Sequence, residues 1–317
     1  MRDDVRGSSA DRPRPLHLSG MITSLKNDKV RYVRALQSRR RVRQRERRFI
    51  FEGVRLVEEA VQTGIPPAFA FYTEALESDE QGGRLLKALR EMNVSCHAVS
   101  VPVMAACSDT VTPQGILAVL PIPNLSRPEH PTITLILDRV RNPGNLGTIL
   151  RTALAAGVEQ VLLTPGTVDA SNPKVVRAGM GAHLHLPLAA LGWEAMSEAV
   201  TGCDVWLAAA DGEMDYTAVD WTRPVALVVG GEATGAGERA QALAQGRVSI
   251  PMAAEVESLN TAVATAVILF EVVRQRAAKD HDAGLTNPAL SDIVAAVSPQ
   301  PAVERGGVTI SQCSPGV

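Results

Sequence analysis

Three short segments of the sequence join glycines to polar side chains in a way that could bind a ligand. They are residues 142–147 (NPGNLG), 230–237 (GGEATGAG) and 250–260 (IPMAAEVESLN). Each follows a short apolar run, so each is expected to be a loop at the end of a strand. Open α/β sheets bind ligands beyond the carboxyl ends of their strands, where loop amides and helix N-termini face the crevice. The sequence therefore predicts a ligand site built from these three loops.

The polar side chains in and after these loops are the candidates for chemistry. Glu232 stands at the tip of the second loop, after two glycines that let a ligand approach the backbone. Asn260 falls in the first turn of a helix that is apolar on nearly every side, where an amide is costly unless it is hydrogen-bonded. Ser258 suits helix capping as well as ligand binding. Arg151 lies off the apolar face of the helix after the first loop, so it either points toward Asn145 or is solvated.

Two common nucleotide-binding fingerprints are missing from the sequence. No GxGxxG motif occupies the first strand–helix turn, and no GxxxxGK[ST] motif occurs. These absences argue against a nucleotide-dependent oxidoreductase and against ATP or GTP hydrolysis. The cysteines are far apart without metal-ligand spacing, and no run of about 18 apolar residues occurs. We therefore expect a soluble cytoplasmic protein without a metal centre or a membrane span.

Positive charge is concentrated near the N-terminus of a chain whose formal net charge is -2. The apolar residues Val30, Val33 and Leu36 fit one helical face, so the cations cover the other faces and the loop that follows. A charge run is usually a solvated face, but this density in an acidic chain favours a phosphate-binding surface. We predict that RNA contacts Lys26, Arg39, Arg40, Arg41, Arg43 and Arg45.

The order of apolar runs and helical periods predicts two α/β domains. The first, residues 21–121, has predicted strands at 49–52, 68–72, 94–99 and 116–120 and predicted helices at 54–63, 83–92 and 101–107. Residues 122–131 are rich in proline and form a predicted linker.

The second domain, residues 132–278, has predicted strands at 133–137, 160–163, 184–188, 204–209, 225–229 and 247–250. Predicted helices alternate with them, including 173–180, 193–200, 237–245 and 258–276. This order is typical of a mostly parallel sheet covered on both faces. Residues 1–20 and 279–317 lack a stable period, so we expect a disordered leader and tail.

Taken together, the three loops resemble the ordered motifs of the SpoU (TrmH) family of RNA ribose 2'-O-methyltransferases. The residues that carry this resemblance are Asn142 to Gly147 with Arg151, Gly230, Gly231, Glu232 and Gly235, and Ile250, Pro251, Met252, Ser258, Leu259 and Asn260. The resemblance spans residues 132–276. The first domain, through residues 112–115 (TPQG), resembles the L30e-like substrate-binding domain of this family, and residues 24–59 resemble its rRNA-modifying members.

The resemblance implies an α/β fold whose C-terminal parallel-sheet methyltransferase domain (SPOUT) is threaded into a trefoil knot. It also implies a homodimer with its site at the subunit interface, and S-adenosyl-L-methionine as the cofactor. By motif position, the cofactor-binding residues would be Gly230, Ile250, Met252, Leu259 and Asn260. The catalytic positions would be Asn145, Arg151, Glu232, Ser258 and Asn260.

The expected function is methylation of a ribose 2'-hydroxyl in structured RNA, with 23S rRNA favoured by the resemblance of the N-terminal segment. Two alternatives stay open at this point. One is a tRNA ribose 2'-O-methyltransferase, and the other is a non-catalytic RNA-binding or ribosome-assembly protein that uses the basic surface alone.

Overall fold

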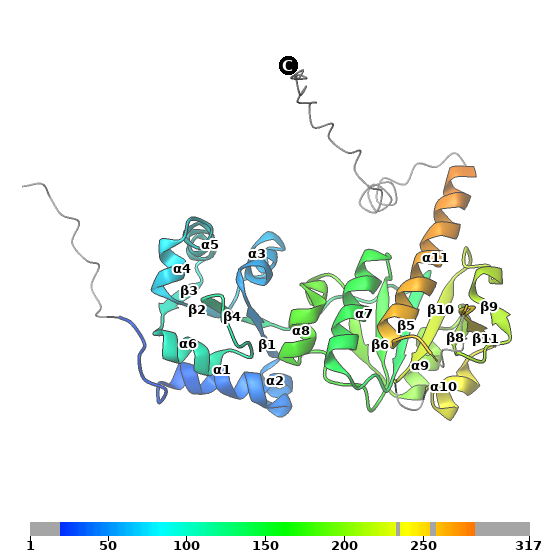
Figure 1. The fold of residues 1–317 in the computed structure, drawn as a ribbon, viewed down its shortest axis with the longest axis horizontal. Coiled ribbons are helices and arrows are strands. Elements are labelled where there is room, and N and C mark those ends of the chain that lie inside the picture. Colours follow the sequence, from blue (N-terminus) through cyan, green and yellow to red (C-terminus); the bar gives the residue numbers. More distant parts are fainter. Residues whose placement is uncertain (1–19, 233–234, 254–257, 283–317) are drawn as a thin grey trace, which may run out of the picture.

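The structure is a computed structural model that describes residues 20–232, 235–253 and 258–282. It contains two α/β units that lie side by side along the long axis of the molecule (Figure 1). The predicted leader, except residue 20, and the predicted tail beyond residue 282 lie outside the described residues. Within the described ranges, no helix is long and apolar enough to cross a membrane.

The N-terminal unit is built on a mixed sheet with the strand order β1-β4-β2-β3. Its strands are β1 (Arg48–Glu52), β2 (Phe69–Tyr72), β3 (Ser95–Ala98) and β4 (Ile116–Pro121). Strand β4 is antiparallel to β1 and β2, whereas β2 and β3 are parallel. Its helices are α1 (Asp28–Ser38), α2 (Arg40–Glu46), α3 (Val54–Gln62), α4 (Glu74–Ser78), α5 (Glu80–Glu91) and α6 (Val101–Cys107).

Both faces of this sheet are covered, as the alternation along β1 shows. Phe49 and Phe51 belong to one core cluster with residues of α3 and α5, and Ile50 belongs to another with residues of α1 and α6. Successive side chains of a strand point to opposite faces, so each face of the sheet receives its own layer of helices. The predicted strands and helices of this unit are confirmed, and the helices α2 and α4 are added to them.

Helix α1 confirms the predicted apolar face. Val30, Val33 and Leu36 are fully buried, and the side chain of Asn27 caps the helix by accepting a hydrogen bond from the Lys29 amide at 2.9 Å. The prediction of a loop for the arginine-rich segment after α1 is wrong. This segment forms the short helix α2, separated from α1 by the extended backbone of Arg39.

The C-terminal unit is built on a parallel sheet with the order β7-β6-β5-β10-β8-β11-β9. Its strands are β5 (Ile133–Asp138), β6 (Gln160–Leu163), β7 (Leu188–Ala190), β8 (Asp204–Ala208), β9 (Met214–Asp215), β10 (Val225–Gly230) and β11 (Gly246–Ser249). Its helices are α7 (Pro143–Ala155), α8 (Pro173–Gly179), α9 (Trp193–Ala199), α10 (Glu238–Leu243) and α11 (Thr261–Asp282), with short 3-10 turns at Ala182–Leu184 and Tyr216–Ala218.

Every residue of β5 is buried, as expected for a strand covered on both faces. Leu135 and Leu137 pack in a cluster with residues of α7 and α11, whereas Ile136 packs on the other face with residues of α9 and α10. The predicted parallel sheet with helices on both faces is therefore confirmed.

The strand predicted at 184–188 is wrong. The chain forms the 3-10 turn Ala182–Leu184 first, and the strand β7 begins at Leu188. Gly181 has φ 91° and its carbonyl accepts a hydrogen bond from the Leu184 amide at 2.9 Å, which closes the turn. Pro187 has no N–H to donate to the ladder, so the strand starts after it.

The last helix, α11, also differs from its prediction of 258–276. It begins at Thr261 and runs to Asp282, so it includes the start of the predicted tail. Because this helix is apolar on nearly every side, the sequence predicts that it is deeply buried, but Val263 is 49% and Phe270 is 37% exposed. The chain therefore leaves part of an apolar helix uncovered.

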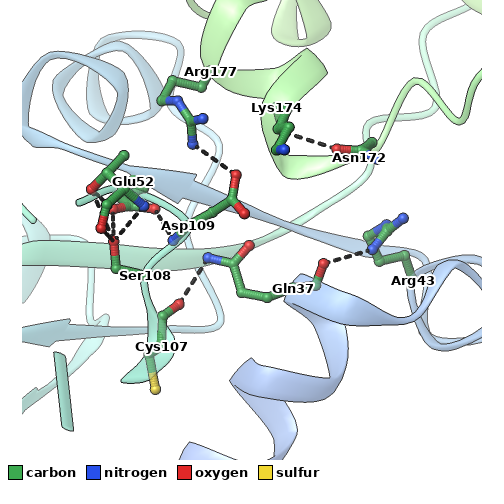
Figure 2. Close-up of polar contacts among 10 residues, drawn as sticks. Gln37, Arg43, Glu52, Cys107, Ser108, Asp109, Asn172, Lys174 and Arg177 are labelled. Carbon is green, nitrogen blue, oxygen red and sulfur yellow. Dashed lines mark hydrogen bonds and ion pairs between the residues drawn. The ribbon is translucent and has the colours of Figure 1, made fainter. Parts of the chain in front are cut away.

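The two units dock through α8, which packs on β1. Val176 of α8 and Leu184 of the following turn belong to a core cluster of the N-terminal unit. Arg177 of α8 points toward Asp109 of the N-terminal unit, with 3.2 Å between its Nη1 and the carboxylate Oδ2 (Figure 2). The docking therefore buries apolar side chains and pairs charges across the boundary.

Candidate functional site

The first two predicted loops meet because their strands are neighbours. Strands β5 and β10 are parallel, and Gly230 is the register partner of Asp138, so both loops leave the sheet at the same edge. A Cβ atom on Gly231 would collide with the carbonyl oxygen of Arg139. A glycine at this position is therefore what allows the second loop to cross the first so closely.

Side chains from all three loops form one hydrogen-bonded chain. The Asn145 Nδ2 donates to the Glu232 Oε1 at 2.9 Å, and the Asn260 Nδ2 donates to the Asn145 Oδ1 at 3.1 Å. The backbone amide of Arg141 donates to the other oxygen of Glu232 at 3.3 Å. We call the residues Glu232, Asn145 and Asn260 the polar chain. The sequence prediction that these three positions converge is confirmed by this geometry.

Asn260 has a second role that the sequence assigns to Ser258. Its Oδ1 accepts hydrogen bonds from the amides of Ala262 at 2.9 Å and Val263 at 3.4 Å, so Asn260 caps α11. The expectation that Asn260 lies inside the helix, buried, is wrong, since it is exposed and precedes the first turn. One amide thus fixes both the start of α11 and the position of Asn145.

Glu232 carries the negative charge of this site. Partial burial raises its pKa, but hydrogen bonds from its own amide, from the Asn145 side chain and from the amides of Arg141 and Asn142 outweigh that effect and hold the pKa below its usual value. The carboxylate is therefore ionised at neutral pH, and it is a hydrogen-bond acceptor only.

A cavity of about 330 Å³ opens beside the polar chain, and we call it the motif pocket. A larger cavity, of about 470 Å³, lies between the two units and is described below. The lining of the motif pocket includes the predicted residues Gly230, Ile250, Met252, Ser258 and Leu259, together with Glu232. A Cβ atom on Gly230 would collide with the backbone of Gly235 and Ala236, so the loop turns back tightly above the end of β10. Neither Asn260 nor Asn145 is part of the wall of this pocket, and both are linked to it by hydrogen bonds that end on Glu232.

Sequence reasoning missed two parts of this site. Ala208, Ala209 and Ala210 at the end of β8 form one wall of the motif pocket, but small apolar residues give no chemical signal in a sequence. Asp138 is 1% exposed and accepts hydrogen bonds from the Gly237 amide at 2.7 Å and the Thr164 hydroxyl at 2.8 Å. The sequence does indicate Asp138 as a candidate, since it is an acidic residue that directly follows the apolar run ITLIL.

Arg151 stands apart from the polar chain in the single protomer. It is exposed on α7, six residues after Asn145, which corresponds to about 9 Å along a helix axis. Among the residues that the structure describes, its guanidinium has no hydrogen bond or ion pair. Of the two orientations left open by the sequence, solvent exposure is the one observed.

The predicted RNA-contacting residues divide into two groups. Lys26, Arg39, Arg40, Arg41 and Arg45 are exposed. Arg43 is only 3% exposed, because its guanidinium pairs with Asp169 of the C-terminal unit at 2.7 Å and donates to the Leu36 carbonyl at 2.7 Å. This corrects the prediction that Arg43 contacts RNA, since its donors are engaged with Asp169 across the boundary and with the Leu36 carbonyl within the N-terminal unit.

Comparison with known proteins shows what this architecture belongs to. The model of the SpoU rRNA Methylase family matches residues 132–270, and the model of the MRM3-like substrate binding domain matches residues 27–118. An uncharacterised tRNA/rRNA methyltransferase of Synechocystis is 34% identical, over 80% of this chain and 94% of that protein. The chain belongs to the SpoU rRNA methylase family.

Other members of this family are equally similar over most of their length. The 23S rRNA (guanosine(2553)-2'-O)-methyltransferase RlmP of Bacillus subtilis is 32% identical, over 79% of this chain and 98% of RlmP. The AdoMet-bound rRNA methyltransferase from Sinorhizobium meliloti is 30% identical with a TM-score of 0.69, covering 80% of this chain and 97% of that one. AviRb of Streptomyces viridochromogenes, solved with AdoMet, is 30% identical with a TM-score of 0.71, covering 79% and 98%.

The family resemblance expected from the three loops is thus confirmed, and with it a methyltransferase of the α/β class. The roles of the single residues within the motif pocket and the polar chain follow below as proposals.

Proposed function

We propose that this SpoU methylase transfers a methyl group from S-adenosyl-L-methionine to a ribose 2'-hydroxyl of RNA. The observation that carries the proposal is the polar chain, in which one side chain from each motif loop meets at the mouth of a pocket. The hydrogen bonds of the polar chain fix the three loops relative to one another. Loops that are fixed in this way can hold two reactants in a defined relative position.

The walls of the motif pocket fit S-adenosyl-L-methionine. Its volume of about 330 Å³ falls within the range of small-molecule sites, and Ile250 and Leu259 give it apolar walls. The backbone at Gly230 offers polar groups without a side chain in the way. The two similar structures that contain AdoMet support the same cofactor here. When bound, this cofactor supplies a methyl group on a cationic sulfonium, and the Glu232 carboxylate would favour that charge.

Arg151 serves as the group that positions the acceptor. Arginine stays protonated far above neutral pH, which makes it a poor general base. It is well suited to bind a phosphate next to the target ribose and so to orient the hydroxyl. The proton of the hydroxyl then leaves to a neighbouring group or to water, while Asn145 and Asn260 keep the loops fixed.

A second copy of the chain would complete this site. Leu154 on α7 and Val263 and Phe270 on α11 are exposed apolar side chains on two helices that pack together. Exposed apolar surface of this kind is typical of an interface. A homodimer that covers α7 would bring Arg151, three residues before Leu154, to the boundary between the subunits, where it could serve the partner's polar chain.

The substrate we favour is 23S rRNA rather than tRNA. The support comes from RlmP and from the 23S rRNA (uridine(2479)-2'-O)-methyltransferase of Streptomyces viridochromogenes, which is 30% identical over 80% of this chain and 92% of that protein. We further propose the cytoplasm as the compartment, an L30e-like fold for the N-terminal unit, and a knotted passage of the chain near α11.

The first test is cofactor binding measured by calorimetry. We expect the protein to bind S-adenosyl-L-methionine and not NAD. Gly230→Ala should abolish binding, because its Cβ would collide with the backbone of Ala236. Gly83→Ala in α5 is the matched control, since its Cβ has only an ordinary contact at 3.4 Å. Equal cofactor affinity in both variants would contradict the assignment of the motif pocket.

The second test maps ribose methylation in rRNA and tRNA from a strain that lacks the gene. Loss of one 2'-O-methyl group from 23S rRNA, restored by the wild-type gene, is the expected result. Loss of a group from tRNA alone would contradict the choice of substrate, and complete methylation of both RNAs would contradict the function.

A further inference from the structure

A second cavity, of about 470 Å³, lies between the two units, and we call it the interdomain cleft. One wall is the loop 164–171 that follows β6, together with the end of β7. The opposite wall comes from α2 and β1 through Arg40, Gln44, Arg47 and Phe49, and the linker residues Ile122 and Leu125 close one side. In the described part of the chain, none of the three motif loops lines this cleft.

The interior of the interdomain cleft combines polar groups of the loop 164–171 with apolar side chains. Phe49, Ile122, Leu186, Leu188 and Leu191 face it from the two units and the linker. Its volume exceeds that of the motif pocket and lies within the range of sites for small organic groups. Apolar side chains of this kind can contact a planar ring, and burial of both faces of the ring contributes favourable binding free energy.

The rim of the interdomain cleft is positively charged. Arg40 and Arg47 line it and are exposed, and neither guanidinium has a hydrogen bond or an ion pair within the described part of the chain. The acidic residue in the lining, Asp169, is already neutralised by Arg43 at 2.7 Å and accepts a hydrogen bond from Ser171 at 2.7 Å. Two unpaired guanidiniums beside an apolar slot suit a ligand that joins an anion to a flat ring.

The cleft opens on the same sheet edge as the motif pocket. Strand β6 pairs with β5, and β5 pairs with β10, all in parallel, so their carboxyl ends form one edge. Neighbouring strands lie about 4.8 Å apart, and two to four strand spacings separate β6 from β10, β8 and β11, so the floor of the cleft lies roughly 10–20 Å from the motif pocket. A few nucleotides of single-stranded RNA would span that separation.

We propose that the interdomain cleft binds an unstacked nucleotide of the RNA substrate that flanks the methylated one. Its base lies between the apolar walls, and its phosphate lies between Arg40 and Arg47. This inference rests on the proposed function, because it places the segment of substrate RNA next to the nucleotide that enters the motif pocket. Proteins that read RNA commonly splay out bases and bury them against side chains, with arginine on the backbone.

The test measures the affinity of the full chain for a short fluorescein-labelled single-stranded RNA by anisotropy. Arg40→Gln and Arg47→Gln should each weaken binding about three- to tenfold, since each removes a charge-assisted phosphate contact. Ala190→Trp, at the exposed end of β7, should fill the cleft and weaken binding about tenfold or more. Arg34→Gln is the matched control, because Arg34 is exposed on the neighbouring helix α1 but does not line the cleft.

A second RNA that lacks one central base separates burial of the base from attraction of the backbone. In the wild type, removal of the base should cost about tenfold in affinity. In Ala190→Trp it should cost nothing, because the base no longer has a slot. Thermal unfolding of each variant checks that the fold is retained.

Two results would overturn the proposal. Equal weakening of RNA binding by Arg34→Gln and Arg40→Gln would mean diffuse attraction by the basic helices, and unchanged RNA binding in Ala190→Trp would mean that nothing enters the cleft. Displacement of the RNA by an equal concentration of a polyglutamate peptide would point to a protein ligand and would also overturn it. Calorimetry with S-adenosyl-L-methionine on the same variants should give wild-type affinity, so a failure of the cofactor assignment is seen separately.

Discussion

The motif pocket and the interdomain cleft lie on one sheet edge and differ in how they are built. The motif pocket is lined by the C-terminal unit alone, through loops and α11, and among the described residues its charged side chain is the carboxylate of Glu232. The interdomain cleft takes its walls from both units, and its free charges are the guanidiniums of Arg40 and Arg47. The first cavity depends on neighbouring parallel strands, whereas the second exists only when the two units are docked.

Because of this difference, each cavity depends on its own set of interactions. The motif pocket depends on the polar chain, whose members are hydrogen-bonded to one another at 2.9 and 3.1 Å. The interdomain cleft depends on docking, in which Arg43 and Asp169 form an ion pair with side chains only 4% and 12% exposed. Substitutions should therefore disturb one cavity and leave the other intact.

The largest effect is expected for Arg43→Met. Removing one partner of a buried ion pair leaves Asp169 uncompensated, and such changes cost about 3–5 kcal/mol of the free energy of unfolding. Urea unfolding measures this loss, and RNA binding in the interdomain cleft should fall with it while cofactor affinity is kept. The double variant Arg43→Met/Asp169→Leu should recover much of the stability.

The matched control for that substitution is Arg31→Met. Arg31 pairs with Asp28 at 3.4 Å, but both side chains are exposed, so the change should cost less than about 1 kcal/mol. If the two variants unfold at the same urea concentration, the ion pair of Arg43 does not hold the units together.

The next effect concerns only the motif pocket. Arg151→Ala should lower the rate of methyl transfer at saturating RNA and cofactor by about a hundredfold or more, because it removes a positioned charge. Arg151→Lys should retain part of the rate, since it keeps the charge but loses the planar fork. Arg239→Ala, an exposed arginine on α10, is the control. Near-wild-type turnover of Arg151→Ala with normal RNA and cofactor binding would refute the role.

A pH effect of similar size is expected on the side of the interdomain cleft. Burial lowers the pKa of His183 to about 4, although the Ala170 carbonyl and Asp169 act in the opposite direction. As the pH falls, the His183 side chain is therefore protonated near pH 6.5 in the unfolded chain but only near pH 4 in the folded chain. The free energy of unfolding should fall by about 3 kcal/mol over that window as the pH decreases.

His183→Gln should remove this slope, as measured by urea unfolding at a series of pH values. His130→Gln, in the exposed linker, should keep the slope of the wild type. A slope that persists in His183→Gln would assign it to other groups.

The smallest effect is expected for the exposed arginines outside the cleft. Replacing Arg39, Arg41 and Arg45 by glutamine should weaken binding of ribosomal RNA a few-fold and flatten its salt dependence. The logarithmic slope should change by about 0.7 for each phosphate that is no longer neutralised. Cofactor affinity should not change. If neither affinity nor slope changes, these arginines are only solvated and the cleft alone binds RNA.

Much of the fold can be predicted from the sequence because local patterns determine it. Periodicity and glycine positions predict the apolar face of α1, the buried strands β5 and β10 and the loops at their ends, and all are observed. The start of β7 is missed, although Pro187 gives a signal for it. The cap of α11 is assigned to Ser258 rather than Asn260, because both residue types cap helices and only the backbone geometry distinguishes them.

The sequence by itself determined which residues could do chemistry and which strand ends would carry them, since amino-acid type and spacing are local properties. Only the tertiary structure decided how each charge is used. Arg40, Arg43 and Arg47 are alike in the sequence, but Arg43 alone meets a carboxylate, on Asp169, 126 residues later. Whether a cation is buried in an ion pair or left free for a phosphate depends on which distant group lies within reach, because desolvation is tolerated only where a partner compensates it.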